Sequence, residues 1–528
     1  MTIAQLISEL SRPSAYPFAV DQVEVRQTHI SAVFLAGDRA FKIKKPVALG
    51  FLDFSSLEQR RHFCDEEVRL NRRLAPDVYL AVLPVTRDKN GCRFGGTGEI
   101  VEWAVEMLRL PDEASLERRL ISGQARGDFW KSLAERVAQF HRDAQSGPEI
   151  AALGRFEVVA ANVRENFTQT INQVGVTVSR SVYQRLLTGT EHHLDLLRPL
   201  IDARAQHNVP RDTHGDLHLD HVYVFPEERL PRDIVIIDCI EFNERFRYAD
   251  PVSDMAFLVM DLKDHGRHAL ADQFARAYFQ AAGDDEGRAL LPFYVAYRSL
   301  VRAKVEGMKL FESEIPEEAK QAARQRSRGH WLLALGELVR PDERPMMLLI
   351  GGLPGTGKST LARQLADRQG FSVIRSDVVR KELAGLSPDD RATEQFGMGI
   401  YSPQATEQTY AECLKRAETL LWNGHRVVVD ANFPSEQLRR RFLDAAVQWG
   451  VPGWFVRCTA PSELVRKRLE SRKGDASDAN WTIYEQAVRQ WEPLGAETRL
   501  SALEISTDGD LETVIADLWR RLEAATMG

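Results

Sequence analysis

Residues 352–359 read Gly-Leu-Pro-Gly-Thr-Gly-Lys-Ser, which is a complete G-x-x-x-x-G-K-[ST] phosphate loop. The apolar run 346–350 before it predicts a buried strand, and residues 360–366 after it predict a helix. Glycines let successive backbone N–H groups converge on phosphate oxygens, and the N-terminus of the helix adds its dipole. We therefore expect a strand, a loop and a helix that bind a nucleotide, rather than a glycine-rich turn that binds nothing.

The residue types of this loop fit the phosphates of ATP and an accompanying Mg²⁺ ion. The expected nucleotide-binding residues are Gly352, Gly355, Thr356, Gly357, Lys358, Ser359 and Thr360. In such loops the lysine reaches the β- and γ-phosphates, and the hydroxyl that follows it holds Mg²⁺. Lys358 is therefore also a candidate catalytic residue, and Ser359 is a candidate metal ligand.

Beyond residue 345 the sequence alternates predicted strands with predicted helices. The predicted strands span 346–350, 372–375, 426–430 and 454–458. Such alternation predicts a doubly wound parallel sheet of the α/β class. The stretch 338–345 is rich in proline and charge, and it is the expected boundary between two domains. We expect a P-loop NTPase or kinase domain over 345–528 and a separate domain over 1–335.

Polar residues stand where two of these strands end, and the carboxyl ends of parallel strands face the ligand crevice. Asp377 follows the second strand and is a candidate general base for an attacking hydroxyl, with a helix N-cap as the alternative. Arg380 lies three residues later, and we expect it to hold an anionic group of the substrate. Asp430 ends the third strand and is a candidate ligand in the metal shell.

A basic stretch at 466–473 precedes Gly474. Its arginines, Arg468 and Arg472 above all, are candidates for a lid that neutralises charge during phosphoryl transfer. The alternative is a solvated basic helix end that complements its own dipole.

These features together resemble the P-loop kinases typified by polynucleotide 5′-kinase and zeta toxin. The residues that carry the resemblance are Gly352–Ser359, Asp377 with Arg380, Asp430-Ala431-Asn432 and the arginines of 466–472. It covers about residues 346–500 and implies transfer of a phosphoryl group to a hydroxyl, without naming one substrate. It also implies that Asp377 is the base and that Arg468 and Arg472 touch the phosphates.

The first part of the chain has a different pattern, of the α+β class. Predicted strands at 30–35 and 40–44 flank a turn, and residues 56–74 predict a helix with charged and apolar faces. Further strands are expected at 82–85 and 100–107, and the pattern is helical from 115 to 140 and from 286 to 335. A strand-rich lobe therefore gives way to a helical one.

Residues 213–225, Thr-His-Gly-Asp-Leu-His-Leu-Asp-His-Val-Tyr-Val-Phe, hold a second candidate site. Asp216 fits a general base, and Asp238, at the end of the apolar run 234–237, fits a metal ligand. Acidic residues at 250–254 open a predicted helix, and we expect them to anchor the catalytic loop through hydrogen bonds.

This second pattern resembles the aminoglycoside phosphotransferase and choline kinase group, over about residues 20–310. The matching residues are His214, Gly215, Asp216, Asp238, Asp250, Pro251, Asp254, Met255 and Ala256. The resemblance implies a bilobal protein-kinase-like fold. It also implies that Lys42 pairs with the nucleotide phosphates, that Glu66 or Glu67 positions this lysine, and that segment 101–107 reads adenine.

The second site departs from the family pattern at His221, which takes the position of a metal-binding asparagine five residues after Asp216. Mg²⁺ prefers oxygen ligands, and the neighbouring Asp220 is an alternative ligand. Weak nucleotide binding, a different metal arrangement and a lobe that is no longer a catalyst all remain open. Two further alternatives are a zinc site at His214, His218 and His221, and Lys44 in place of Lys42.

Composition sets wider bounds. The chain has 528 residues, 44% hydrophobic and 27% charged, with a formal net charge of −7, so no global basic field favours nucleic acid, although a local basic groove stays possible. The sequence shows no apolar run near 18 residues, no signal peptide and five scattered cysteines, which predicts a cytoplasmic protein with reduced thiols and no membrane span.

The sequence thus predicts a fusion of two phosphotransferase-like domains. The leading hypothesis is an ATP- and Mg²⁺-dependent kinase that phosphorylates a hydroxyl of a small-molecule or nucleotide-like acceptor, with the C-terminal domain as the better-supported catalyst. One alternative is a polynucleotide 5′-hydroxyl kinase with a basic groove from residues 439–441 and 466–473. Another is a regulatory module that hydrolyses ATP and carries a degenerate N-terminal lobe.

Overall fold

The computed structural model describes residues 1–50, 52–125, 127, 129–229, 232–312, 315–387, 390, 398–471, 477 and 479–527. The chain divides into two compact units. Unit 1 comprises residues 1–159, 199–258 and 273–288, and unit 2 comprises residues 160–198, 259–272 and 289–528. The expected domain boundary at 338–345 falls on a short turn of 3-10 helix, Pro341–Glu343, inside unit 2, and the division into 1–335 and 345–528 stays a prediction.

Unit 1 begins with an antiparallel sheet in the order β1-β2-β3-β8-β6-β7. Its strands are β1 (Val23–Gln27), β2 (Ser31–Ala36), β3 (Arg39–Lys44), β6 (Tyr79–Asp88), β7 (Gly91–Phe94) and β8 (Glu99–Leu108). The predicted hairpin at 36–39 is confirmed, since Ala36 pairs with Arg39. Apolar residues of alternate positions, Phe34, Phe41 and Phe94 among them, fill one face together with α1 (Ile3–Leu10). The predicted helix 56–74 is α2 (Leu57–Asn71), which packs on β6 and β8.

Two short strands, β4 (Ala48–Leu49) and β5 (Leu52–Asp53), pair between β3 and α2. The elements after β8 are mostly helical, with the short strands β9 (Arg211–Asp212), β10 (Val222–Val224), β11 (Ile234–Ile236) and β12 (Tyr248–Ala249) between them. The helices are α3 (Leu116–Ile121), α4 (Phe129–Asp143), α5 (Pro148–Leu153), α6 (Phe156–Gln169), α7 (Arg180–Gln206), α8 (Glu244–Arg247), α9 (Pro251–Asp264) and α10 (His268–Ala282). The helical pattern expected over 115–140 corresponds to two helices, α3 and α4, and α3 ends before Gly123, whose left-handed φ of 71° stops a helix.

The buried carboxylate of Asp254 accepts several hydrogen bonds that hold the loop after β9 in place. The Asp254 carboxylate accepts the backbone N–H groups of His214 at 3.0 Å and of Gly215 at 2.8 Å. It also accepts a hydrogen bond from Nε2 of His141 at 3.0 Å, which leaves Nδ1 of that ring to accept from the Tyr278 hydroxyl at 2.7 Å. The predicted anchoring of this loop by an acidic residue of the helix at 250–258 is thus seen in the structure.

Burial raises the pKa of Asp254, but the hydrogen bonds that its carboxylate accepts from His141 and from the backbone of His214 act in the opposite direction, and its pKa is about 2. The ionised carboxylate is therefore the form that the folded protein stabilises.

Unit 2 contains a sheet in the order β14-β15-β13-β16-β17 whose neighbouring strands are all parallel. The strands are β13 (Met347–Gly351), β14 (Phe371–Arg375), β15 (Arg426–Asp430), β16 (Gly453–Thr459) and β17 (Ala502–Ser506). The predicted strands before residue 460 are confirmed, whereas β17 was not predicted. The sheet's helices are α13 (Lys358–Gln369), α14 (Ser376–Leu383), α15 (Pro403–Trp422), α16 (Glu436–Gln448), α17 (Ser462–Ser471), α18 (Trp481–Gln490), α19 (Ala496–Leu500) and α20 (Leu511–Met527).

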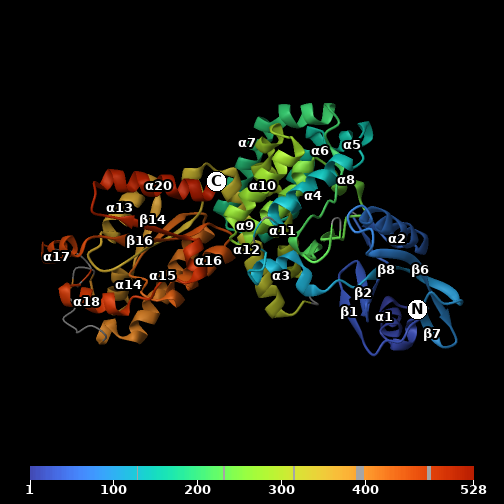
Figure 1. Cartoon of the computed structure of the whole chain (residues 1–528), viewed down its shortest axis with the longest axis horizontal. Helices are drawn as coiled ribbons and strands as arrows, with labels where there is room; N and C mark the ends of the chain where they lie inside the picture. Colours follow the sequence, from blue (N-terminus) through green and yellow to red (C-terminus); the bar gives the residue numbers. More distant parts are fainter. Residues whose placement is uncertain are drawn as a thin grey trace. The chain divides into compact units, whose positions relative to one another are not determined.

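Helices cover both faces of this sheet, which confirms the doubly wound arrangement. On one face, Leu348, Ile350 and Val428 pack against residues of α13 and α20, such as Leu365 and Leu518. On the other face lie α15 and α16, which contact β15, β13 and β16 (Figure 1). The apolar runs of the central strands read as continuous because both of their faces are buried.

A pair of long helices, α11 (Leu291–Met308) and α12 (Glu317–Leu338), belongs to the same unit. The α12 helix packs on α16, and the Arg328 guanidinium lies 5.0 Å from the Trp422 ring and 5.9 Å from the Trp449 ring. Glycines allow a close backbone approach here, because a Cβ on Gly450 would lie 2.1 Å from the carbonyl oxygen of Gly329. A helix expected in the N-terminal domain thus supports the parallel-sheet region.

Two expectations from composition can be compared with the described residues. All five cysteines, Cys64, Cys92, Cys239, Cys413 and Cys458, are buried free thiols. None of the described helices combines the length and the apolar character that a membrane span needs.

Gly450→Ala should destabilise the protein by about 3 kcal/mol or more, because a side chain there meets both a left-handed backbone and the Gly329 carbonyl. Gly370→Ala is the matched control, since Gly370 has a similar φ of 66° but nothing within 4 Å of the added carbon. That control should lose only about 1 kcal/mol. Urea unfolding followed by tryptophan fluorescence measures both, and equal losses would show that the approach of α12 does not matter.

Asp254→Asn should lower the free energy of unfolding by about 2–4 kcal/mol at pH 7, because buried partners lose a charged acceptor. The folded-state pKa is depressed, so this stabilisation is present above the unfolded pKa of about 4 and disappears as the pH falls toward 2. The difference between wild type and variant should therefore shrink in urea titrations between pH 5 and pH 3. A difference that stays constant over this range would contradict the assignment.

Candidate functional site

Parallel register brings the ends of three strands of unit 2 to one edge of the sheet. Asp430, the last residue of β15, pairs with Ile350 of β13 on one side and with Arg375 of β14 on the other. Gly351 pairs with Arg457 of β16. The phosphate loop leaves β13 at this edge, so every side chain that follows a strand end lies near it.

The phosphate loop has the backbone that its glycines predict. Gly352, Gly355 and Gly357 have positive φ values of 134°, 79° and 85°. A Cβ on Gly352 would lie 2.5 Å from the carbonyl oxygen of Cys458, so no other residue fits there. Within the loop, the Thr356 hydroxyl donates to the Leu353 carbonyl at 2.7 Å. The chain then enters α13, with Thr360 exposed in its first turn.

The two residues expected to hold Mg²⁺ are in contact. Burial raises the pKa of Asp430, while the charge of Lys358 and a hydrogen bond from Ser359 act in the opposite direction. The Lys358 ammonium donates to the Leu353 carbonyl at 2.9 Å, on the inner side of the loop. A hydroxyl and a carboxylate are hard oxygen donors, so this pair fits Mg²⁺.

Asp377 lies in the first turn of α14, directly after β14. The cap position of that helix is Arg375, so the alternative that Asp377 is an N-cap is wrong. Arg380 donates to the carbonyl of Ile400 at 2.7 Å and to the hydroxyl of Thr406 at 3.2 Å. It therefore ties α14 to the segment that leads into α15.

Of the two expected lid arginines, only Arg468 can be placed, because Arg472 lies outside the described residues. Arg468 donates to the Thr507 hydroxyl at 3.0 Å and to the Thr507 carbonyl at 2.7 Å. The Thr507 hydroxyl donates in turn to the Thr356 carbonyl of the phosphate loop at 2.8 Å. Thr507 was not predicted as a site residue, because it follows β17, a strand that was not predicted either.

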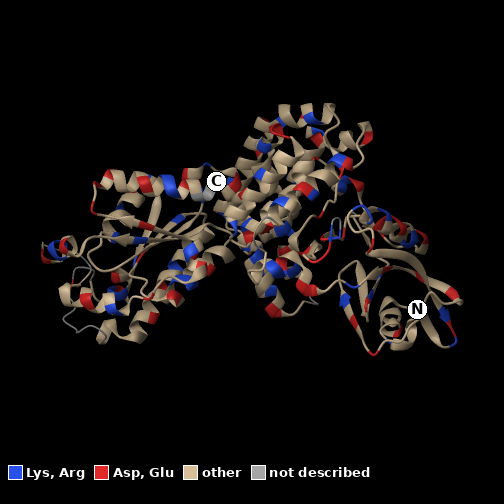
Figure 2. Cartoon of the chain, viewed as in Figure 1, with Lys and Arg blue, Asp and Glu red and all other residues tan. Residues whose placement is uncertain are grey.

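The basic groove expected to include residues 439–441 does not form as expected. Arg439 is fully buried and donates to the carbonyls of Phe433 and Glu492, both at 2.9 Å. The side chain of Arg441 pairs with Glu407 at 2.7 Å. Figure 2 shows basic and acidic residues interspersed along both units. Arg439 is thus a structural residue and is not available for the basic groove that the polynucleotide alternative expects.

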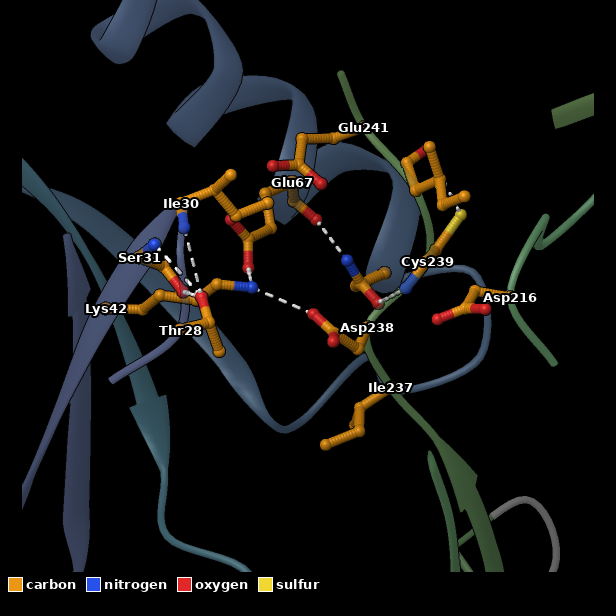
Figure 3. A network of polar contacts seen from close by, with 12 residues as sticks. Thr28, Ile30, Ser31, Lys42, Glu67, Asp216, Ile237, Asp238, Cys239 and Glu241 are labelled. Atoms are coloured by element: carbon orange, nitrogen blue, oxygen red, sulfur yellow. Dashed lines mark hydrogen bonds and ion pairs between the residues drawn. The ribbon is translucent and has the colours of Figure 1, made fainter. Parts of the chain in front are cut away.

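In unit 1, a lysine on β3 links two carboxylates that come from distant parts of the chain. The Lys42 ammonium lies 2.8 Å from Oε1 of Glu67 on α2 and 2.8 Å from Oδ1 of Asp238 after β11 (Figure 3). Glu66 points elsewhere and pairs with Arg69 at 2.7 Å. The structure therefore selects Glu67 from the two expected glutamates.

Lys44, the alternative to Lys42, is buried. Its ammonium lies 2.7 Å from Oε2 of Glu67 and also contacts Glu241, and only 1% of its side chain is exposed. Burial lowers the pKa of Lys44, but Glu241 and Glu67 outweigh it and leave the pKa raised. Lys42, by contrast, faces Asp238, whose side chain is 45% exposed. The Lys42 side chain is 15% exposed, so it is the more accessible of the two lysines. Glu241 is a partner of Lys44 that was not predicted.

Asp238 has an unusual backbone with a φ of 64°, which is strained for a residue other than glycine. Its N–H donates to the Tyr79 hydroxyl at 3.1 Å, and the N–H of Cys239 donates to Oδ1 of Asn71 at 2.8 Å. The charge of Lys42, the largest influence, holds the pKa of Asp238 well below its usual range. These contacts fix an ionised carboxylate opposite the lysine.

His221 lies between the two acidic residues of this site. Its Nδ1 donates to the backbone carbonyl of Asp216 at 2.8 Å, and its Nε2 lies 3.7 Å from Oδ2 of Asp238. Burial lowers the pKa of His221, but Asp220, Asp216 and Asp238 outweigh it and leave the pKa raised. His218 approaches the Asp216 carboxylate at 3.1 Å. An imidazole surrounded by carboxylates therefore occupies the place where the family pattern has an asparagine.

The zinc alternative finds no support in the part of the chain that the structure describes, where no group of three His, Cys, Asp or Glu side chains is arranged for a metal ion. The metal role expected for Asp238 stays a prediction. Between β1 and β2, the Thr28 hydroxyl accepts the N–H of Ser31 at 3.1 Å and so closes the turn (Figure 3).

Comparison with known proteins gives three kinds of match. The family model described as "AAA domain" matches residues 347–494. The uncharacterized protein Rv2004c of Mycobacterium tuberculosis (strain ATCC 25618 / H37Rv) is 34% identical over 461 residues, which cover 87% of this chain and 88% of that protein. The uncharacterized protein Mb2027c of Mycobacterium bovis gives the same figures.

Among solved structures, a choline/ethanolamine kinase family protein from Mesorhizobium loti covers 63% of this chain and 97% of its own, at 16% identity and a TM-score of 0.35. A sugar kinase from Janibacter sp. HTCC2649 covers 35% of this chain and 96% of its own, at 19% identity and a TM-score of 0.27.

The match to the mycobacterial proteins covers most of this chain and most of each of those proteins. This chain therefore belongs to the family of those two proteins, and its residues 347–494 carry a P-loop domain of the AAA description.

Proposed function

We propose that the protein is an ATP-dependent phosphotransferase that moves the γ-phosphate of ATP to a hydroxyl of a small-molecule or nucleotide-like acceptor. The observation that carries the proposal is the convergence of Lys358, Ser359, Asp430 and Asp377 at one edge of the parallel sheet. A phosphate loop alone serves many NTPases, whereas a carboxylate placed after the neighbouring strand adds a base for an acceptor hydroxyl.

The nucleotide would lie on the backbone N–H groups of residues 352–360, with Lys358 next to the β- and γ-phosphates. Ser359 and Asp430 would hold Mg²⁺, which when bound neutralises charge on those phosphates. Lys358 must leave the Leu353 carbonyl to reach the phosphates, and a flexible four-carbon stem allows that movement.

In the transfer step the acceptor oxygen forms a bond to the γ-phosphorus, and the bond from that phosphorus to the β,γ-bridging oxygen breaks. Asp377 takes the proton of the acceptor hydroxyl, and ADP leaves with the electron pair of the broken bond. Arg380 would orient an anionic part of the acceptor. Arg468, held beside the phosphate loop through Thr507, and Arg472 would stabilise charge on the transferred group.

For the N-terminal part we propose a kinase-like domain over 1–335 that binds a nucleotide through Lys42, with Glu67 as its positioning partner. The ion pair between a strand lysine and a helix glutamate is the arrangement that protein kinases need for activity. Asp238 would serve as a metal ligand and Asp216 as the base. Both acidic residues lie beside His221, which replaces an oxygen ligand.

His221 also supports a second candidate function. An imidazole between Asp216 and Asp238 competes with a divalent cation for the same carboxylates. The N-terminal part would then bind a ligand without transferring phosphate and would regulate ATP use by the P-loop domain. ATP hydrolysis without any phosphorylated product would favour this function.

Asp377→Asn should lower transfer from γ-labelled ATP to acceptors in a cell extract by about 10²–10⁴-fold, because the amide cannot take the proton. Affinity for a fluorescent ADP analogue should change by no more than about twofold, since the base does not hold the nucleotide. Asp367→Asn, an exposed position on α13, is the matched control and should leave both values unchanged. Full turnover of the Asp377 variant would rule this residue out as the base.

A further inference from the structure

Arg375 stands at the centre of the candidate metal site, although no part of the proposed reaction uses it. It is the last residue of β14 and pairs in register with Asp430, the last residue of β15. Residues paired in this way on adjacent strands point to the same face of a sheet. The arginine therefore lies beside Asp430 because of backbone register, not because of a flexible surface contact.

The Arg375 guanidinium reaches both oxygen donors assigned to Mg²⁺. Its Nε lies 3.4 Å from Oδ2 of Asp430, and its NH2 group lies 3.5 Å from the hydroxyl oxygen of Ser359. The Asp430 side chain is only 5% exposed, so its negative charge needs a nearby positive charge when no metal is bound. Lys358 of the phosphate loop provides one such charge, and Arg375 provides a second one from β14, on the other side of Asp430.

Space for a second position of this arginine adjoins the site. A cavity of about 650 Å³ is lined by Arg375 and Ser359 together with Ala366, Val378, Glu382 and Leu420. The Arg375 side chain is 23% exposed, and it lies at the border between this cavity and Asp430. Glu382 offers a carboxylate within the cavity, where it already pairs with Arg416 at 2.7 Å.

We propose that Arg375 is a positioning residue that stands in for the divalent cation. In the nucleotide-free protein its guanidinium balances the charge of Asp430 together with Lys358 and bridges the two metal ligands. When Mg²⁺ binds with the nucleotide, the guanidinium withdraws into the adjoining cavity, toward Glu382. The inference rests on the proposed function and extends it, because it predicts how this site exchanges one cation for another.

If this exchange occurs, loss of Arg375 should have opposite effects on ligand binding in the absence and in the presence of Mg²⁺. Without Mg²⁺, Arg375 shields the nucleotide phosphates from the negative charge of Asp430, so its loss weakens nucleotide binding. With Mg²⁺, Arg375 competes for the same oxygens, so its loss lowers the concentration of Mg²⁺ that is needed. A substitution that only damaged the site would weaken binding under both conditions.

Arg375→Met tests this in the full-length protein, since methionine keeps much of the length and removes the charge. Binding of a fluorescent ADP analogue is measured in EDTA and across a Mg²⁺ titration. We expect about five- to tenfold weaker binding in EDTA and a half-saturating Mg²⁺ concentration about five- to tenfold lower, the scale of a partly buried ion pair. Arg363→Met, an exposed arginine of α13 that lines the same cavity, is the matched control and should change neither value.

A second variant tests the withdrawal itself. Ala366→Phe places a phenyl ring in the cavity and reduces the space for the guanidinium, so it should raise the half-saturating Mg²⁺ concentration in the wild-type background and leave it unchanged in the Arg375→Met background. The inference would be overturned if Arg375→Met weakened nucleotide binding in EDTA and also raised the half-saturating Mg²⁺ concentration. It would also be overturned if Ala366→Phe raised that concentration equally in both backgrounds. A wild-type protein that binds no ADP analogue under either condition would overturn the proposed function instead.

Discussion

The parallel register of β13, β14 and β15 is the constraint on which the C-terminal site depends. It sets Arg375 and Asp430 side by side at the edge where the phosphate loop leaves the sheet. Glycine is required at that edge, because a Cβ on Gly352 would meet the Cys458 carbonyl of β16. Strand pairing, loop conformation and the position of Asp430 therefore depend on one another. A shift of register in any of these strands would separate the site residues.

The sequence predicted those parts of this site that depend on local pattern. The loop at 352–359, Asp377 and Asp430 all follow apolar runs that form buried strands, and strand ends meet at one edge in any parallel sheet. Thr507 and Arg375 could not be found in this way. Their contacts depend on which strands are neighbours and on the register of those strands. The order β14-β15-β13-β16-β17 cannot be inferred from the sequence of any single segment.

In unit 1 the sequence identified candidate site residues but not which side chains contact them. The choice of Glu67 over Glu66 depends on which side of α2 faces the sheet, and a helix with a weakly amphipathic pattern leaves that open. Glu241 reaches Lys44 only because the chain turns at Asp238 with a positive φ. The helical pair α11 and α12 was expected with the N-terminal domain, yet it packs within unit 2 through the contact of Gly329 with Gly450.

The central claim is that the P-loop region carries out the phosphoryl transfer. The most direct measurement is transfer from γ-labelled ATP to acceptors in a cell extract, compared among wild type, Lys358→Ala and Asp216→Asn. The account predicts a labelled product that disappears with Lys358→Ala and persists with Asp216→Asn, because only the first variant removes the charge beside the γ-phosphate of the P-loop site. A product that disappears with Asp216→Asn and persists with Lys358→Ala would contradict the account and assign transfer to the N-terminal site.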